Sequence, residues 1–168
     1  LVADGHEVIA VDCLRDNYDR AEKRANLAWV AEAGPVVGAE IDLSADPLVG
    51  LLDDAEIVFH LAGRPGVRGS WGDGLAPYLR DNVLATERLL TAAVGAGVAR
   101  VVYASSSSVY GEAERYPCRE TDLPRPHSPY GITKLAGEHL CLAHARHDGL
   151  PVVALRYFSV YGPRQRPG

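Results

Sequence analysis

A tyrosine and a lysine stand four residues apart in the segment 130–134, at the start of a predicted helix. This spacing places the side chains of Tyr130 and Lys134 on one face of the helix. A nearby ammonium favours the phenolate form of a tyrosine, and a group that titrates near the working pH is an efficient general base. We therefore expect Tyr130 to take a proton from a substrate hydroxyl, with Lys134 as its electrostatic partner. The same spacing also occurs by chance in many helices, so the interpretation depends on what surrounds it.

A run of hydroxyl side chains, Ser105 to Ser108, comes at the end of a predicted strand that precedes this helix. Ligands of an open parallel sheet bind at the carboxyl ends of its strands, where hydroxyls can hold a substrate hydroxyl or carbonyl. The alternative is a serine-rich turn without a chemical role. The sequence predicts a site where this run meets the helix of Tyr130.

Acidic side chains end two further predicted strands, Asp12 after 6–12 and Asp42 after 36–42. An acid at the position of Asp12 accepts hydrogen bonds from adenosine ribose hydroxyls, and its charge repels a 2′-phosphate. Asp42 suits the edge of an adenine. Leu43, next to Asp42, suits the face of an adenine. An ordinary turn acid is the alternative in each case.

Small residues follow the predicted strand 57–61, where Ala62 and Gly63 come after Leu61. They would let a flat ligand approach the backbone closely, although a plain connecting turn is the alternative. His60 lies inside this strand with no Cys, Asp or Glu beside it. We expect it to be a hydrogen-bonded core histidine, and we expect no metal site.

Strands and helices alternate along the chain, which is typical of βαβ units and a mostly parallel sheet covered on both faces. The predicted class is a doubly wound α/β fold. A serine cap and a proline at the first helical position mark the start of the last helix, and residues 1–5 are expected to be the tail of a helix that ends at Gly5. The predicted strands are 6–12, 36–42, 57–61, 100–105 and 151–156, the helices are 18–32, 47–52, 75–95 and 129–147, and 107–127 is expected to be a loop.

The composition excludes several classes of protein. The chain has 168 residues, which suits one domain, and 17 Lys+Arg against 22 Asp+Glu give a net charge of −5. This balance argues against nucleic-acid binding, and no apolar run approaches the ~18 residues of a membrane helix. The three cysteines are widely spaced, which favours a reducing, cytoplasmic compartment. The chain contains no methionine, so we expect it to be a piece of a longer protein.

Together, in their order and spacing, the motifs resemble those of the extended short-chain dehydrogenase/reductase superfamily. Within it, the chain is most similar to NAD-dependent nucleotide-sugar epimerases and dehydratases, especially UDP-glucose and UDP-glucuronate 4-epimerases. The resemblance implies a Rossmann-like NAD-binding domain over residues 1–168, without the first strand, its glycine-rich turn and the C-terminal substrate domain. The segments that carry it are Val11-Asp12, His60-Leu61-Ala62-Gly63, Asn82-Val83, Ser105 to Gly111, Pro129 to Lys134 and Arg156-Tyr157-Phe158.

The resemblance also implies roles for single residues. Tyr130 would be the catalytic base, Lys134 its partner and a ligand of the nicotinamide ribose, and Ser106 the hydroxyl that bonds the reacting sugar oxygen, with Ser107 as its rival. Arg166 resembles an arginine that meets the substrate carboxylate in uronate epimerases, although a basic turn is the alternative. The other cofactor contacts implied are Asp12, Asp42, Leu43, Leu61, Ala62, Gly63, Asn82, Tyr157 and Phe158.

The implied reaction is 4-epimerisation of a nucleotide sugar, with a UDP-sugar favoured, through a transient 4-keto sugar and tightly held NAD. Ser107 and Ser108 stand where dehydratases usually carry an Asp-Glu pair, which disfavours 4,6-dehydration, and Ser159 stands where many epimerases have asparagine. The alternatives are a dehydratase or decarboxylase on the same scaffold, or a non-catalytic NAD-binding relative. By analogy, the full-length protein is expected to be a homodimer through the helices at 75–95 and 129–147, and the 168-residue chain alone is expected to be inactive.

Overall fold

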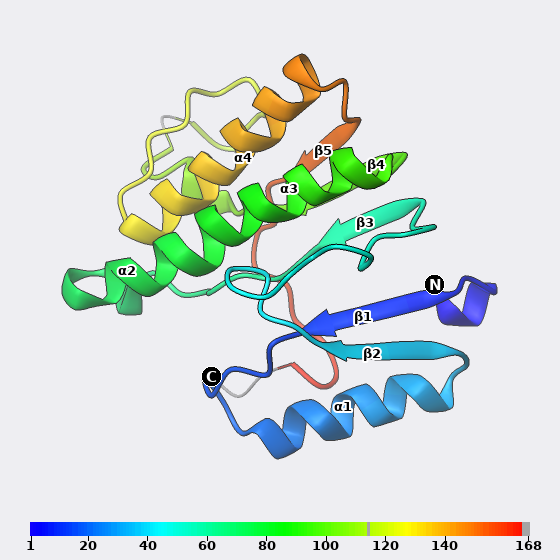
Figure 1. The fold of residues 1–168 in the computed structure, drawn as a ribbon. Coiled ribbons are helices and arrows are strands. Elements are labelled where there is room, and N and C mark those ends of the chain that lie inside the picture. Colours follow the sequence, from blue (N-terminus) through cyan, green and yellow to red (C-terminus); the bar gives the residue numbers. More distant parts are fainter. Residues whose placement is uncertain (114, 166–168) are drawn as a thin grey trace. The chain divides into compact units, whose positions relative to one another are not determined.

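Residues 1–113 and 115–165 are described by the structure, a computed structural model. They form two compact units, one of residues 1–42 with the segment from Val160, and one of residues 43–159. Figure 1 shows the strands β1 (Val8–Asp12), β2 (Val36–Glu40), β3 (Ile57–His60), β4 (Arg100–Ala104) and β5 (Val152–Leu155), and the helices α1 (Arg20–Glu32), α2 (Leu75–Tyr78), α3 (Ala85–Ala96) and α4 (Pro129–His147).

The first unit is a parallel pair of strands with one helix. β1 and β2 pair so that Val8 lies opposite Val36 and Asp12 opposite Glu40. Helix α1 packs against β2, and it begins where the Asp19 side chain accepts a hydrogen bond from a backbone N–H of its first turn. Both strands therefore run in one direction, and the chain leaves them at the same edge.

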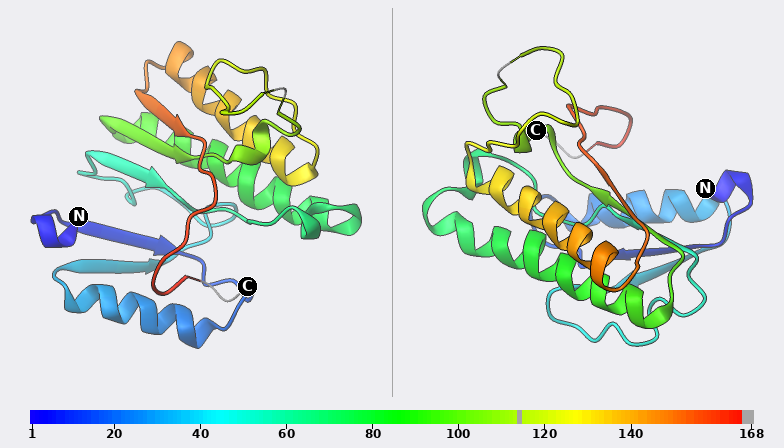
Figure 2. Two further views of the ribbon diagram at one scale, coloured as in Figure 1. Left: turned by 180° about the vertical axis from the view of Figure 1, so that it is seen from behind. Right: turned by 90° about the horizontal axis from the view of Figure 1, so that it is seen from above.

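The second unit is a three-stranded parallel sheet in the order β3-β4-β5. Helices α3 and α4 pack on each other and lie on one side of it (Figure 2). Because successive side chains of a strand point to opposite faces, His60, Val101 and Tyr103 are buried on one side of the sheet. The alternate residues of β3 and β5 are exposed on the other side: Ile57, Phe59, Val153 and Leu155.

The predicted α/β class with parallel strands is confirmed, and each predicted strand lies within two residues of an observed one. The predicted helix at 75–95 is a continuous run of α2, a π-helical stretch Leu79–Leu84 and α3. A π-helical turn contains an extra residue, and such turns occur often at functional sites. The tail expected at residues 1–5 is a 3₁₀ turn that ends at a left-handed Gly5.

The predicted helix at 47–52 is wrong, because residues 47–48 have no regular secondary structure and 49–52 form turns. Gly50 has a φ of +77° and Asp54 a φ of +63°, values that a right-handed helix cannot contain. Leu48 and Leu52 are nevertheless buried, so their apolar spacing reflects packing rather than a helix. None of the helices in the described part of the chain is long and apolar enough to cross a membrane.

Candidate active site

The first turn of α4 carries the predicted base. Ser128 caps the helix, since its Oγ accepts a hydrogen bond from the backbone N–H of Gly131 at 3.0 Å, and Pro129 occupies the first helical position. Tyr130 is half-buried, with its ring edge-on to the ring of Tyr78 at a centroid distance of 6.1 Å. Helix formation from this point places Lys134 one turn further along the same face.

Lys134 is buried, with only 7% of its surface exposed. Its Nζ lies 4.8 Å from the centroid of the Tyr103 ring, and a Cβ added at Gly63 would be 3.6 Å from that nitrogen. The loop after β3 therefore passes beside the ammonium. Burial lowers the pKa of Lys134 to about 8, an effect that Cys141 and Glu138 oppose.

The serine run forms a 3₁₀ turn, Ser107–Val109, which packs on α4. Ser106 caps it, with its Oγ accepting the N–H of Ser108 at 3.1 Å. A Cβ added at Gly131 would be 2.7 Å from the carbonyl oxygen of Ser108, so the turn lies directly against the residue that follows Tyr130. The structure thus brings the two predicted parts of the site, the serine run and the start of α4, into contact.

Asn82 lies in the π-helical stretch and is almost completely buried. Its side-chain amide bonds to both backbone groups of Arg64, and its Nδ2 also donates to Oγ1 of Thr133 at 3.0 Å. Thr133 in turn donates to the carbonyl oxygen of Tyr130 at 2.8 Å. Asn82 therefore ties the loop after β3 to the first turn of α4.

The predicted adenosine-side acids lie in the first unit, at the carboxyl edge of β1 and β2. The backbone N–H of Ile41 donates to the carbonyl oxygen of Asp12 at 3.2 Å, so the chain continues beside Asp12 after β2 ends. The Asp12 carboxylate accepts the N–H of Leu14 at 2.6 Å, and Asp42 forms an ion pair with Arg15 at 2.7 Å.

The remaining predicted contacts lie in the second unit. Leu43 is its first residue and is buried, whereas Leu61, Ala62 and Gly63 are exposed after β3. Tyr157 and Phe158 are exposed after β5, and Ser107 is half-buried, with its N–H donating to the carbonyl oxygen of Tyr157. Arg166 lies outside the described residues.

Sequence reasoning missed a buried ionic cluster one turn beyond Lys134. Glu138 accepts hydrogen bonds from Oγ of Ser105 at 2.5 Å and from the Nε and a terminal nitrogen of Arg156 at 2.9 and 2.8 Å. Burial alone would raise the pKa of Glu138, but the bonds from Arg156 and Ser105 hold it below its ordinary value. A glutamate four residues after the lysine was the available signal, because this spacing keeps it on the same buried face.

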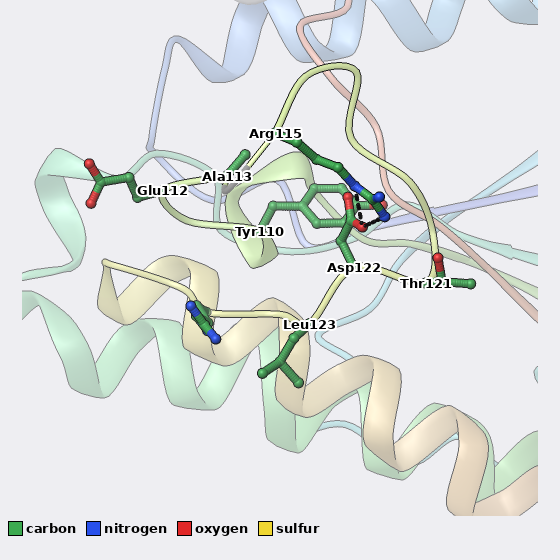
Figure 3. Close-up of a pocket in the computed structure, with 8 residues that line it drawn as sticks. Tyr110, Glu112, Ala113, Arg115, Thr121, Asp122 and Leu123 are labelled. Carbon is green, nitrogen blue, oxygen red and sulfur yellow. Dashed lines mark hydrogen bonds and ion pairs between the residues drawn. The ribbon is translucent and has the colours of Figure 1, made fainter.

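A surface pocket of about 450 Å³ lies in the loop after the serine turn (Figure 3). The ion pair of Arg115 with Asp122 spans it, and the hydrogen bond from Arg115 lowers the pKa of Asp122. The predicted site residues do not line this pocket. Its lining residues are Tyr110, Glu112, Ala113, Arg115, Thr121, Asp122, Leu123 and Arg125. In the described ranges, no group of three or more His, Cys, Asp or Glu side chains could hold a metal ion.

Comparison with known proteins gives concordant matches. The sequence pattern of the NAD dependent epimerase/dehydratase family matches residues 1–168. "Uncharacterized UDP-glucose epimerase YtcB" of Bacillus subtilis (strain 168) is 50% identical over 162 residues, which are 96% of this chain and 51% of that protein. The chain therefore spans about half the length of this relative.

Two solved structures illustrate the range of similar folds. UDP-glucuronic acid 4-epimerase from Bacillus cereus, in complex with UDP-glucuronic acid and NAD, has a TM-score of 0.92 and 39% identity, covering 98% of this chain and 52% of that one. DesIV, a dTDP-glucose 4,6-dehydratase from Streptomyces venezuelae with NAD and TYD bound, has a TM-score of 0.87 and 33% identity, covering 96% of this chain and 49% of that one. The fold expected from the sequence is thus the fold of these enzymes.

Proposed function

The chain belongs to the NAD dependent epimerase/dehydratase family, and from this premise we propose that the protein containing it is an NAD-dependent nucleotide-sugar 4-epimerase. A UDP-sugar is the proposed substrate, because the similar proteins include a UDP-glucose epimerase and a UDP-glucuronic acid 4-epimerase. The observation that carries the proposal is the position of Tyr130, one helical turn before a buried lysine and against a turn of serines. We propose residues 1–168 as its NAD-binding domain.

The residues at the Lys134 end of the site fit a flat cofactor. The backbone of Gly63 lies so close to Lys134 and Asn82 that a Cβ would be 2.9 Å from the Asn82 Oδ1, so the missing side chain keeps this approach open. In the first unit, Asp12 suits the adenosine ribose and Asp42 the adenine. The proposed NAD-binding residues are Asp12, Asp42, Leu43, Leu61, Ala62, Gly63, Asn82, Tyr130, Lys134, Tyr157 and Phe158. When bound, NAD would accept a hydride from C4 of the sugar and return it to the opposite face.

Tyr130 is proposed to take the proton of the C4 hydroxyl. It would give the proton back after the 4-keto sugar has rotated in the site. The ammonium of Lys134 stabilises the phenolate before the first of these steps and again after the second. Ser106 is proposed to bond the reacting oxygen. Its Oγ already accepts the N–H of Ser108, so its own proton is available to donate to the substrate. The proposed substrate-binding residues are Ser106, Ser107, Tyr130 and Arg166, the last by resemblance alone.

A homodimer through the α2–α3 region and α4 is proposed for the full-length protein. The support is a set of large apolar side chains exposed on these helices, a pattern typical of helices that pack against a partner. A cytoplasmic location is proposed because Cys13, Cys118 and Cys141 are all free thiols. The exposed apolar residues are Leu79, Leu84, Ile132 and Leu142.

Incubation of the full-length protein with UDP-glucose, UDP-glucuronate and dTDP-glucose, with the products identified by NMR, tests the reaction. We expect the 4-epimer of a UDP-sugar, with no loss of water or carbon dioxide. A 4-keto-6-deoxy sugar or a pentose as the product would instead establish a dehydratase or a decarboxylase.

The Tyr130→Phe variant tests the assigned base. Turnover should disappear while bound NAD is retained, because the phenyl ring preserves the shape but has no proton to exchange. Tyr116→Phe is the matched control, since Tyr116 is 82% exposed and outside the site. Turnover that survives in Tyr130→Phe would remove Tyr130 from the mechanism.

A further inference from the structure

Glu138 is a buried carboxylate that the proposed mechanism does not use. It lies on α4 with 6% of its surface exposed, and its carboxylate accepts hydrogen bonds from two other elements. Ser105, after β4, donates to Oε1, and Arg156, after β5, donates to both oxygens. A charge buried this deeply is tolerated only when it is paired and hydrogen-bonded, so the three side chains form one unit.

Both donors stand immediately before a proposed site residue. Ser105 precedes Ser106, and Arg156 precedes Tyr157. The backbone ladder between β4 and β5 continues through this place, because Ser105 N–H donates to Leu155 O at 2.9 Å and Ser107 N–H to Tyr157 O at 2.8 Å. Glu138 therefore holds the carboxyl ends of two strands together at the point where the serine turn begins.

Arg156 extends the same unit around the serine turn. Its guanidinium lies 4.8 Å from the centroid of the Tyr110 ring, and Tyr110 directly follows the turn Ser107–Val109. The turn is thus held before its first residue by Ser105 and after its last residue by Tyr110. Ser105 donates directly to Glu138, and Tyr110 contacts Arg156, which also donates to Glu138.

We propose that Glu138 is a positioning residue that clasps the ends of β4 and β5 to α4, so that Ser106 is set against Tyr130. The same carboxylate supplies a negative charge near Lys134. The clasp is defined as Ser105, Glu138 and Arg156. Its catalytic consequence rests on the proposed function, whereas its structural part does not.

The charge near Lys134 follows from the groups that face it from α4 and from the neighbouring strands. Burial lowers the pKa of His60 to about 3 and raises that of Cys141 to about 12, so both are uncharged near neutral pH. Burial also raises the pKa of Tyr103. Glu138 is then the carboxylate in this set, and it is paired with Arg156. The titratable and charged groups are His60, Tyr103, Tyr130, Glu138, Cys141 and Arg156.

Hydrogen exchange measured by mass spectrometry on the full-length protein tests the clasp. In Glu138→Gln and in Arg156→Lys, amides of Ser105–Tyr110 and Arg156–Phe158 should exchange about tenfold faster, because each variant removes part of the bidentate bond. The β1–β2 segments should be unchanged in both. Glu87→Gln is the matched control, since it removes the same charge from the neighbouring helix, where Glu87 contacts His144 and is 41% exposed.

The pH dependence of kcat distinguishes the effect of the Glu138 charge on Lys134 from the effect of Glu138 on the positions of the strand ends. Glu138→Gln should move the alkaline limb, which reports Lys134, to lower pH by about one unit. Arg156→Lys keeps the charge of the cation and should lower kcat while leaving the limb in place. If Glu138 had only a structural role, both variants would have a lower kcat, and the alkaline limb would stay in place in both.

The outcomes are distinguishable. Unchanged exchange in both variants would overturn the clasp, whatever the activity. Faster exchange with an unmoved limb in Glu138→Gln would overturn the electrostatic part. A wild-type protein that does not epimerise any of the sugars would overturn the proposed function, and the exchange data would still decide on the clasp.

Discussion

The Nε2 of His60 lies 2.8 Å from the Oγ1 of Thr86, and this hydroxyl donates to the carbonyl oxygen of Asn82 at 2.7 Å. Since the Thr86 proton is directed at Asn82, the Thr86 oxygen is left to accept from His60. His60 therefore carries its single proton on Nε2, and Nδ1, which has no hydrogen-bond partner among the described residues, is unprotonated. The expected burial of His60 is confirmed, and its expected hydrogen bonding is confirmed at Nε2 but not at Nδ1.

The first prediction concerns acid stability. Burial, and secondly the charge of Lys134, lower the pKa of His60 to about 3 from 6.5. Between these values the unfolded chain binds a proton that the folded chain does not, so stability falls as the pH drops from 6.5 toward 3. From pH 7 to pH 5 the wild type should lose about 2 kcal/mol more than His60→Gln.

Urea denaturation at both pH values measures this difference in the free energy of unfolding. His147→Gln is the control, because His147 is 89% exposed, and its pH dependence should match that of the wild type. A His60→Gln variant with the pH dependence of the wild type would contradict the prediction.

The second prediction is that the buried ammonium of Lys134 lowers stability at neutral pH. Burial lowers its pKa to about 8 from 10.5, so the cost is fully present below pH 8 and disappears as the pH rises toward 10.5. Lys134→Met, which keeps the side-chain size, should be about 2 kcal/mol more stable than the wild type at pH 7. Most of this gain should be lost at pH 10, and turnover should be lost at both.

Lys23→Met is the contrasting variant in the same denaturation experiment. Lys23 is also buried, but its Nζ donates to the Arg15 carbonyl and to Oδ1 of Asn17 at 2.5 and 2.6 Å. Its removal takes both of these hydrogen bonds away, so Lys23→Met should be less stable than the wild type at both pH values. A stabilised Lys23→Met variant would contradict the prediction. It would mean that the burial of a lysine, and not its hydrogen bonding, determines whether replacement by methionine raises or lowers the free energy of unfolding.

The third prediction compares two helical glycines. A Cβ at Gly137 in α4 would overlap the hydroxyl of Tyr103, whereas a Cβ at Gly95 in α3 would meet nothing within 4 Å. Gly95→Ala should gain up to about 1 kcal/mol from helix propensity. Gly137→Ala should lose about 1–3 kcal/mol through overpacking. Thermal melts measure both, and changes of the same sign would contradict the packing of α4 on β4.

The fourth prediction tests the amide of Asn82. Its Nδ2 donates to Arg64 O and to Thr133, and a carboxylate has no proton to offer in either bond. Asn82→Asp should therefore lose about 1–3 kcal/mol of stability and exchange amides of Gly63–Gly66 faster. Asn26→Asp is the control, because the Asn26 Oδ1 accepts a hydrogen bond from Arg164 that a carboxylate oxygen can also accept. An equal loss of stability in the two variants would contradict the role of Asn82 Nδ2 as a hydrogen-bond donor.

The fifth prediction ranks the serines. Ser106→Ala should lower kcat of the full-length protein about 100-fold by removing the proposed hydrogen bond to the reacting oxygen. Ser107→Ala and Ser108→Ala should have smaller effects, and steady-state kinetics with the same UDP-sugar compare all three. A larger loss in Ser107→Ala would move the assignment to its rival.

Several elements could be predicted from the sequence because their signals are local. The capped start of α4 and the spacing of Tyr130 and Lys134 depend on residues within one helical turn, and the apolar runs of β1 to β5 indicated parallel strands. The expected burial of these strands on both faces is wrong, because side chains such as Ile9, Val37 and Val153 are exposed. The segment 47–52 shows the limit of such signals. Its leucines have helical spacing, but Gly50 has a left-handed φ of +77°, so packing rather than a helix explains the burial of Leu48 and Leu52.

What the sequence determined by itself is the α/β alternation and the residues able to do chemistry, since periodicity and capping act over a few neighbouring positions. What only the tertiary structure decided is which side chains those residues meet. Glu138 bonds to Ser105 across 33 residues and to Arg156 across 18, and Asn82 reaches Thr133 across 51. Such contacts exist only once the parallel sheet has brought its strand ends to the first turns of α4, and no local pattern encodes that closure.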